Sequence, residues 1–213
     1  LDDSETKEML SKTYPYTILI TEDDDEVRGF LERELSLHFK IRTAANGKEA
    51  LRVLEEEEIS LVVSDVMMPE MNGFELCRTI KSQLPFSHIP VILLTALTDE
   101  RQRIFGITGG ADDYIQKPFH TDYVKIKIIH LLQERQKLRE RLLEKLRDNK
   151  LLLSEPEKVE SIDDAFLRKF AEQIEAVYAD PEYNVEKLSE TLGLSRGHLH
   201  RKIKELTGTA PVE

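Results

Sequence analysis

The stretch Leu61-Val62-Val63-Ser64-Asp65 is a short apolar run that ends on an acidic residue. Three further runs share this design and end on polar side chains: Ile18 to Thr21 before Glu22 and Asp23, Val91 to Leu94 before Thr95, and Tyr114 to Gln116 before Lys117. Short apolar runs separated by helical patterns are typical of buried parallel strands. The carboxyl ends of parallel strands lie along one edge of an open α/β sheet, where such sheets carry their sites. The sequence therefore predicts a crevice that gathers carboxylates, a hydroxyl and an ammonium.

Around these runs, apolar strands alternate with helical patterns from Pro15 to about Glu134. The expected strands are 17–21, 40–44, 60–64, 91–94 and 113–116. The expected helices are 26–37, 47–58, 74–83, 99–107 and one that starts near 121. Five such strand–helix units make one domain of ordinary size, and we expect residues 1–14 before it to form a polar linker.

Composition narrows the class of protein. The 213 residues allow one or two domains, and the net charge of −11 argues against a chain-wide nucleic-acid or membrane surface. The single cysteine, Cys77, excludes an internal disulfide and a cysteine-based zinc site. No run approaches the roughly 20 apolar residues of a membrane span. We expect a cytoplasmic chain without membrane contact, and the start at Leu1 suggests a fragment of a longer protein.

Four blocks of this sequence resemble the receiver domain of bacterial two-component response regulators. They are residues 18–23, Ser64-Asp65-Val66-Met67-Met68-Pro69-Glu70-Met71-Asn72-Gly73, Thr95-Ala96, and Lys117-Pro118-Phe119. Their order and spacing match the family over about residues 16–134. The resemblance implies a doubly wound (βα)5 fold of the flavodoxin-like kind, α/β in class, with a parallel sheet of strand order 2-1-3-4-5.

The predicted crevice suits phosphoryl transfer onto a carboxylate. Asp65, alone at the tip of the central strand, is the expected phosphoacceptor. A hard cation, Mg2+ or Mn2+, would reduce the repulsion between a carboxylate and a phosphoryl group. Asp23 is the expected direct ligand, and Glu22 beside it would act through water. The resemblance adds the backbone carbonyl of Met67 as a further ligand.

Three more residues complete the expected site. Lys117 should pair with Asp65 and then with a phosphoryl oxygen, and a cis Lys117–Pro118 bond would aim its ammonium inward. Thr95 should reach a new phosphoryl oxygen with its hydroxyl. Tyr114 resembles the family's switch residue, although it also fits an ordinary strand position. Residues 24–26 are expected to be the acidic start of a helix rather than further ligands.

The last part of the chain has a helical pattern. Leucines at spacings of three and four predict a helical connector over 135–160, either a coiled coil or a single solvated helix. Residues 161–213 resemble the beginning of an AraC-type DNA-binding domain, with a helix-turn-helix across 185–203 and without the second such unit of that family. The candidate DNA contacts are Arg196, His198, His200, Arg201 and Lys204. Residues 195–210 hold four Lys or Arg and one Glu, a local positive charge that suits DNA.

The combined resemblance predicts a phosphorylation-controlled transcription regulator rather than an enzyme with a separate substrate. The expected partners are a histidine kinase as phosphodonor, DNA, and a second copy of the chain after phosphorylation. We favour the C-terminal part of a hybrid histidine kinase, whose parent would be anchored in the inner membrane, over a free-standing AraC-type regulator. A phosphatase with an aspartate nucleophile is disfavoured, because its paired acids follow the first strand and the isolated Asp65 follows the third. No P-loop is present.

Overall fold

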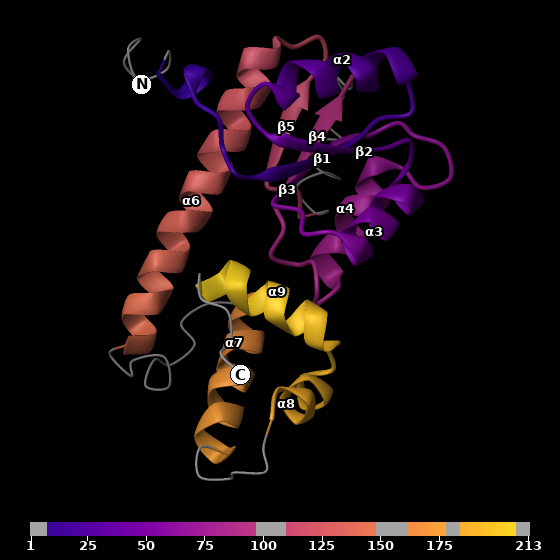
Figure 1. Cartoon of the computed structure of the whole chain (residues 1–213). Helices are drawn as coiled ribbons and strands as arrows, with labels where there is room; N and C mark the ends of the chain where they lie inside the picture. Colours follow the sequence, from indigo (N-terminus) through magenta and orange to yellow (C-terminus); the bar gives the residue numbers. More distant parts are fainter. Residues whose placement is uncertain (1–7, 97–109, 148–161, 178–183, 208–213) are drawn as a thin grey trace. The chain divides into compact units, whose positions relative to one another are not determined.

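A computed structural model describes residues 8–96, 110–147, 162–177 and 184–207 of the chain (Figure 1). The chain divides into two compact units. The first, here called the α/β unit, comprises Leu1–Lys81 and Ile89–Glu134, and the second, the helical unit, comprises Ser82–His88 and Arg135–Glu213.

Five parallel strands form the sheet of the α/β unit. They are β1 (Thr17–Thr21), β2 (Lys40–Ala44), β3 (Leu61–Asp65), β4 (Val91–Thr95) and β5 (Asp113–Gln116). Their spatial order is β2-β1-β3-β4-β5, and all four neighbouring pairs are parallel. This order confirms the expected arrangement. The register pairs Thr21 with Ser64 and Asp65 with Leu94, so the carboxyl ends of the three central strands lie level with one another.

Helices cover both faces of this sheet. Figure 1 shows α2 (Asp25–Ser36) and α6 (Thr121–Arg147) on one face, and α3 (Gly47–Glu56) and α4 (Gly73–Ser82) on the other. Successive strand residues point to opposite faces, so a strand buried on both sides needs a continuous apolar run. One buried cluster joins alternate strand residues to α2 and α6: Ile18, Ile20, Leu61, Val63, Ile92, Leu94, Ile115, Leu31, Leu35, Val124, Ile128, Ile129 and Leu132, with Phe39.

The helix starts follow from capping residues. Asp24 precedes α2, and its carboxylate accepts the backbone amides of Glu26 and Val27 at 2.9 and 3.0 Å. Asn46 precedes α3 and accepts the amide of Glu49 at 3.0 Å. Such caps satisfy amide groups that have no partner inside the helix. The expected role of the acids after Asp23 as a helix start is confirmed for Asp24. The helix predicted at 99–107 lies outside the described residues.

Residues 8–14 differ from the linker expected for 1–14. Residues 8–11 form a helical turn, and the ring of Tyr14 stacks on Phe39 with centroids 5.6 Å apart. The Tyr14 amide donates to the carbonyl of His38 at 2.7 Å, and its hydroxyl donates to that of Met9 at 3.1 Å. Met9 and Tyr14 pack against the core cluster of the sheet. These two side chains dock a segment that is otherwise polar.

The helical unit contains α7 (Ile162–Val177), α8 (Val185–Leu192) and α9 (Arg196–Thr207). Gly193 ends α8 with a left-handed conformation, φ 69°, which glycine adopts without strain. The Ser195 hydroxyl accepts the amide of His198 at 3.2 Å and so caps the start of α9. The buried core of the three helices consists of Phe166, Leu167, Leu188, Leu192, Leu194, Leu199 and Ile203.

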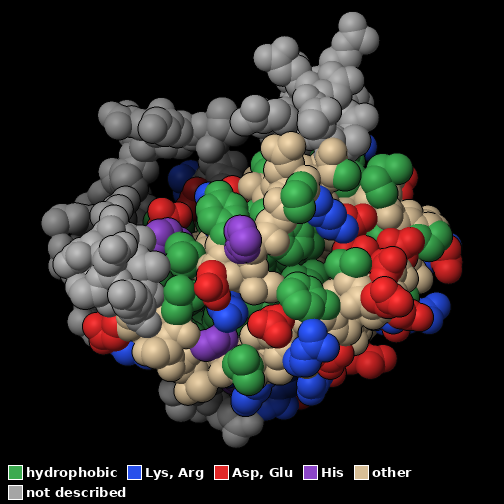
Figure 2. Space-filling model, turned by 90° about the horizontal axis from the view of Figure 1, so that it is seen from above, with side chains coloured by type: hydrophobic (Ala, Val, Ile, Leu, Met, Phe, Trp, Pro, Cys, Tyr) green, Lys and Arg blue, Asp and Glu red, His purple; other side chains and the backbone are tan. Residues whose placement is uncertain are grey.

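α6 continues as one helix to Arg147, into the expected connector. Coiled-coil pairing of the connector stays a prediction, and its residues 148–160 lie outside the described part of the chain. Among the described residues, none of the helices combines the length and hydrophobicity needed to cross a bilayer. On the face shown in Figure 2, acidic, basic and apolar side chains are intermixed.

Candidate functional site

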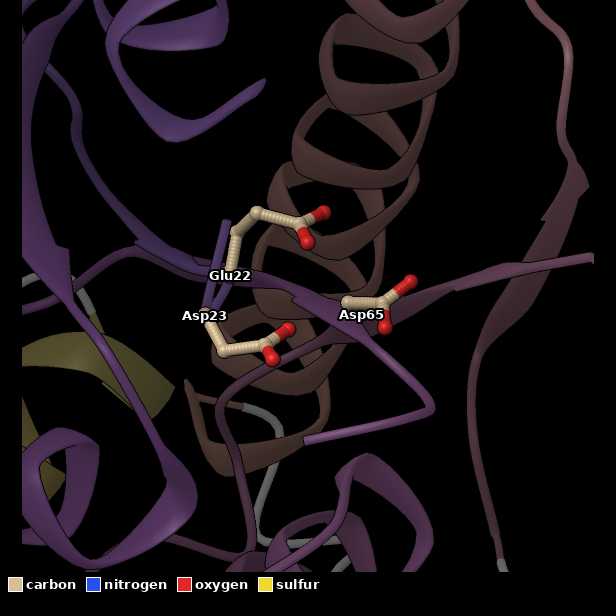
Figure 3. A group of neighbouring side chains, drawn as sticks. All are labelled: Glu22, Asp23 and Asp65. Carbon is tan, nitrogen blue, oxygen red and sulfur yellow. The ribbon is translucent and has the colours of Figure 1, made fainter. Parts of the chain in front are cut away.

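Three carboxylates meet at the carboxyl end of the sheet. Glu22 and Asp23 directly follow β1, and Asp65 is the last residue of β3. One carboxylate oxygen from each lies within 4.8 Å of the others (Figure 3). The level register of β1 and β3 produces this meeting, because it places residues 43 positions apart in the sequence at the same height of the sheet. The predicted convergence of these three acids is thus present in the structure.

The three acids differ in exposure. Glu22 and Asp65 are buried, at 2% and 6% of their full exposure, whereas Asp23 is exposed. Burial raises the pKa of the Glu22 carboxyl, and the hydrogen bond from Lys117 offsets this rise only in part. The group therefore contacts solvent through Asp23.

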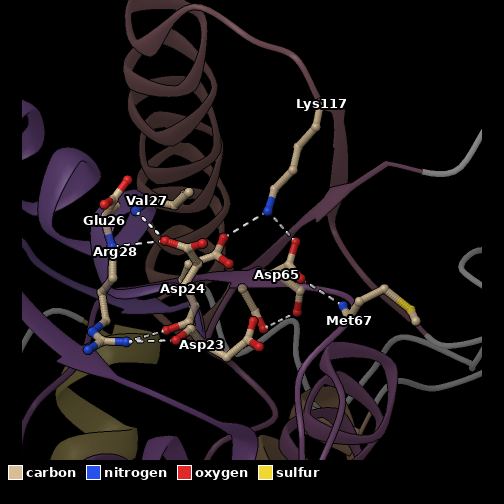
Figure 4. Close-up of polar contacts among 10 residues, drawn as sticks. Asp23, Asp24, Glu26, Val27, Arg28, Asp65, Met67 and Lys117 are labelled. Carbon is tan, nitrogen blue, oxygen red and sulfur yellow. Dashed lines mark hydrogen bonds and ion pairs between the residues drawn. The ribbon is translucent and has the colours of Figure 1, made fainter.

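Lys117 supplies the positive charge among these acids. Its ammonium lies 2.6 Å from Asp65 Oδ1 and 2.8 Å from Glu22 Oε2 (Figure 4). Burial lowers the pKa of Lys117, but the hydrogen bonds to Asp65 and Glu22 outweigh burial and leave that pKa raised. The ammonium therefore stays charged. The Lys117–Pro118 peptide bond is cis, as expected.

The second oxygen of Asp65 is held by the backbone. Asp65 Oδ2 accepts the amide of Met67 at 2.8 Å, while the Met67 side chain is 67% exposed. The Met67 amide therefore lies beside Asp65, although its side chain points to solvent, and the role of its carbonyl as a metal ligand stays a prediction. The two oxygens of Asp65 thus face different partners, Lys117 and the β3–α4 loop.

Thr95 and Tyr114 lie on the two neighbouring strands. Thr95 is the last residue of β4, and its carbonyl accepts the Lys117 amide at 2.7 Å. Tyr114 precedes the core residue Ile115 in β5, so its ring points to the opposite face of the sheet from the α2–α6 cluster. Burial raises the pKa of the Tyr114 hydroxyl to about 12. Thr95 lies on β4, next to β3, and Tyr114 lies on β5 beyond it, so both are on the side of Asp65 away from β1.

The acidic group has the donors that a hard divalent cation needs. All three carboxylates present oxygen, and the amide–carboxylate contact brings the Met67 backbone beside them. Mg2+ prefers oxygen ligands and is commonly held by one or two carboxylates together with water. Glu22, Asp23 and Asp65 therefore fit this class of ion.

Comparison with known proteins agrees with this geometry. The family described as "Response regulator receiver domain" matches residues 18–129, which include the three acids and Lys117. The chain belongs to the response regulator receiver domain family. The matched residues include the five parallel strands and the acidic edge.

Relatives extend this picture. Histidine kinase P4 of Formosa agariphila is 36% identical over all 213 residues of this chain, which span 15% of that protein. Transcriptional regulatory protein GltR of Pseudomonas aeruginosa is 42% identical over 121 residues, 56% of this chain and 50% of GltR. This chain thus covers at most half of either relative. The signal receiver domain of a histidine kinase from Syntrophus aciditrophicus has a TM-score of 0.54 at 38% identity, covering 56% of this chain and 91% of that one.

The residues predicted to contact DNA lie along α9. Arg196 and His200 are exposed, and His198, Arg201 and Lys204 are half buried. Arg196 Nη1 lies 3.7 Å from Glu186 Oε1 of α8. Positions 196, 200 and 204 are four residues apart and therefore share one side of the helix. The structure brings these three basic residues to one helix face.

Lys202 is buried, although a charged residue in a basic helix is expected to be exposed. It was counted with the positive surface of residues 195–210, but it is fully buried, and its ammonium lies 2.6 Å from Asp163 Oδ1. This lysine therefore adds no charge to the surface of α9. A sequence cannot reveal the burial, because an isolated lysine in a basic helix is usually solvated.

Arg28 is a residue near the site that the sequence did not single out. Its guanidinium contacts the backbone that carries Glu22 and Asp23. Contacts from a side chain to a backbone carbonyl depend on the local path of the chain and leave no residue pattern. Only the place of Arg28, five residues after Asp23, hints at such a role.

Proposed function

We propose that the receiver takes a phosphoryl group from a histidine kinase onto Asp65 and thereby controls a DNA-binding output segment. The single observation that supports this function best is the meeting of Asp65 with Glu22, Asp23 and Lys117 at one edge of the sheet. An isolated surface carboxylate has no ammonium partner at 2.6 Å and no second pair of acids beside it. The chain modifies itself in this proposal and turns over no separate substrate.

The residues take defined roles in the transfer. An oxygen of Asp65 attacks the phosphorus of a phosphohistidine, the phosphorus–nitrogen bond breaks, and the imidazole leaves. Lys117 stays beside Asp65 and balances charge on the transferred group. Glu22, Asp23, Asp65 and the Met67 carbonyl would hold Mg2+ or Mn2+, which reduces repulsion between the anionic partners. The proposed ligands are the residues already gathered at the acidic group.

Thr95 and Tyr114 would change conformation when Asp65 is phosphorylated. The phosphorylated carboxylate carries about one more negative charge than the free carboxylate, because Asp65 is already anionic, and it gains three further acceptor oxygens. Thr95, at the end of the neighbouring strand, can donate its hydroxyl to one of them. Its movement would open space for the Tyr114 ring and change the surface around β5 and α6. Such contacts can tip a two-state element separated by a few kcal/mol.

The decisive experiment treats the chain with Mg2+ and acetyl phosphate and measures intact mass. We expect a single phosphoryl adduct that is stable in acid and labile in base. Asp65→Asn should abolish it, because the amide is not a nucleophile of this kind. Asp122→Asn is the matched control, because this exposed acid at the start of α6 lies outside the site and should leave the adduct unchanged. An adduct that persists in Asp65→Asn would refute the assignment.

We further propose that the helical unit is the start of an AraC-type DNA-binding domain. Support comes from two short helices, α8 and α9, joined by a turn at Gly193, and from Arg196, His200 and Lys204 along one side of α9. A helix docked in the major groove presents such a face to phosphates and base edges. Salt-dependent binding of the phosphorylated chain to DNA tests this part.

The parent protein is proposed to be a hybrid histidine kinase. Support comes from the protein named histidine kinase P4. The similarity to it extends over all 213 residues of this chain and therefore includes the helical unit. Phosphodonor, receiver and DNA would then all work in the cytoplasm, while the parent is anchored in the inner membrane. A kinase domain encoded upstream in the same reading frame would support this parent, and a separate short reading frame would support a free-standing regulator instead.

A further inference from the structure

Arg28 links the start of α2 to the acidic loop. Its Nη1 donates to the carbonyl of Glu22 at 2.7 Å and also reaches that of Asp23 at 3.5 Å, while Nη2 pairs with the carboxylate of Asp25 (Figure 4). Only 20% of the Arg28 side chain is exposed. The guanidinium is therefore packed against the loop rather than extended into solvent.

The two carbonyls belong to the residues that present the first two carboxylates of the site. The backbone pairing of this strand with β2 ends at Glu22, whose amide donates to the carbonyl of Ala44 at 3.1 Å. The next fixed point is Asp24, which caps α2. Between these points, the Arg28 guanidinium donates to the backbone carbonyls of Glu22 and Asp23 and holds this part of the loop.

Rotation of these two peptides would move both carboxylates. A peptide unit is planar, so a carbonyl that is held in place also fixes the dihedral angles that flank it. A guanidinium presents several donors in a rigid fork and can satisfy two acceptors at once, which an ammonium on a flexible stem does less well. Arg28 is built into the helix by its own amide, which donates to the Asp24 carbonyl at 2.8 Å.

We propose that Arg28 is a positioning residue for the cation site, holding the Glu22–Asp23 backbone so that both carboxylates face Asp65. The proposal rests on the proposed function, because it takes the acidic group to bind a divalent cation. Outer residues that orient ligands typically change metal affinity about 10- to 100-fold when removed. Arg28 touches two ligand residues through their backbone and none of the reacting atoms.

A purely electrostatic role and a positioning role predict opposite changes in cation affinity when Arg28 is removed. Its positive charge lies near the cation site and, taken alone, repels a cation, so a purely electrostatic role predicts tighter binding after Arg28→Gln. The positioning role predicts weaker binding, because the loop loses its anchor. Asp25 already pairs with the guanidinium, which reduces the electrostatic effect.

The test measures Mg2+ binding to the full, unphosphorylated chain by isothermal titration calorimetry. We expect Arg28→Gln to weaken binding by about tenfold and Arg28→Lys by less, because an ammonium can still donate to one carbonyl. Arg33→Gln is the matched control: Arg33 lies in the same helix, is 70% exposed and contacts Glu34 and the ring of Phe30, so binding should not change.

A second readout separates positioning from general stability. The thermal midpoint of the metal-free chain should be similar in wild type and Arg28→Lys, while the rise in midpoint on adding Mg2+ should be smaller in the variant. Unchanged or tighter Mg2+ binding by folded Arg28→Gln or Arg28→Lys would overturn the proposal and leave the proposed function intact. Failure of the wild type to bind Mg2+ would overturn both.

Discussion

Lys202 and Asp163 form an ion pair that ties α9 to α7 inside the helical unit. The Lys202 ammonium is 2.6 Å from Asp163 Oδ1 and 5.2 Å from the centroid of the Phe166 ring. Burial alone raises the pKa of the Asp163 carboxyl, but the Lys202 ammonium outweighs burial, so this pKa lies below its ordinary value. Loss of either partner would leave a charge in an apolar environment without compensation.

We expect Asp163→Asn to destabilise residues 162–207 by roughly 3 kcal/mol at neutral pH, because the buried Lys202 loses its counter-ion. Native-state hydrogen exchange of the α7, α8 and α9 amides measures this loss within the whole chain. Asp164→Asn is the control, because Asp164 is the exposed neighbour of Asp163. Equal protection in wild type and Asp163→Asn would show that the pair contributes nothing to stability.

The stability that the Lys202–Asp163 pair contributes also depends on pH, and the lowered pKa of Asp163 fixes the direction of this dependence. The pKa of Asp163 is lower in the folded state than in the unfolded chain, so its stabilisation is fully present above the unfolded value of about 3.9. It disappears as the pH falls through the lower folded-state pKa. The difference in stability between wild type and Asp163→Asn should therefore shrink in that acid range.

At the scale of single elements, the connection from β3 to α4 is closely packed. Its residues leave Asp65, pass the exposed Met67 and return to α4 at Gly73. The Gly73 amide donates to the carbonyl of Val66 at 3.0 Å. A β-carbon at position 73 would overlap the carbonyl oxygen of Asp65 itself. The phosphoacceptor and the start of α4 are therefore packed backbone against backbone.

We expect Gly73→Ala to destabilise the receiver by roughly 2–3 kcal/mol and to slow formation of the acetyl phosphate adduct, because the overlap must displace Asp65 or α4. Urea unfolding and the rate of adduct formation measure the two effects. The control is Gly29→Ala in α2, which has open space around the new methyl group and should stabilise the chain by about 0.5–1 kcal/mol. Normal stability of Gly73→Ala would contradict the packing described.

Elements differ in how well the sequence predicts them. The predicted and observed ranges of β1, β2 and β5 agree. For β1, which is buried on both faces, the reason is a continuous apolar run with a sharp polar end. β3 is shifted by one residue, to Leu61–Asp65, and β4 extends one residue further than predicted, to Thr95. The docking of residues 8–14 was not predicted, since Met9 and Tyr14 act through contacts with residues distant in sequence.

The site residues show a similar division. Asp65, Glu22, Asp23 and Lys117 could be placed from the sequence because parallel strands bring their carboxyl ends to one edge. Arg28 could not be placed, because its partners are backbone carbonyls that any residue carries. The burial of Lys202 depends on the packing of three helices, which no local pattern encodes.

At the scale of the whole molecule, an acidic chain with net charge −11 carries basic residues along one side of α9. Repulsion from the acidic remainder should weaken binding to DNA by a single copy. Two aligned copies would present two basic faces at once and gain from their effective concentration. Phosphorylation that favours pairing would therefore also favour DNA binding.

We expect the beryllofluoride-loaded chain to form a dimer in light scattering and to bind DNA more tightly than the unloaded chain, with affinity falling steeply as salt rises. Arg196→Ala should dimerise normally and reduce the salt dependence of binding by about one phosphate contact. Asp65→Asn should stay monomeric. An unchanged mass and scattering profile at full loading would refute the dimerisation.

The pairing of Lys117 with both Glu22 and Asp65 has a consequence for ion selectivity. Three carboxylates and one ammonium leave the group with two uncompensated negative charges. A divalent ion matches that formal charge and gives electroneutrality, whereas Na+ or K+ leaves the group anionic and a lanthanide leaves it cationic. A phosphoryl group on Asp65 then makes the filled group negative again. In the proposed phosphorylated state, a bound divalent ion would therefore no longer neutralise the group completely.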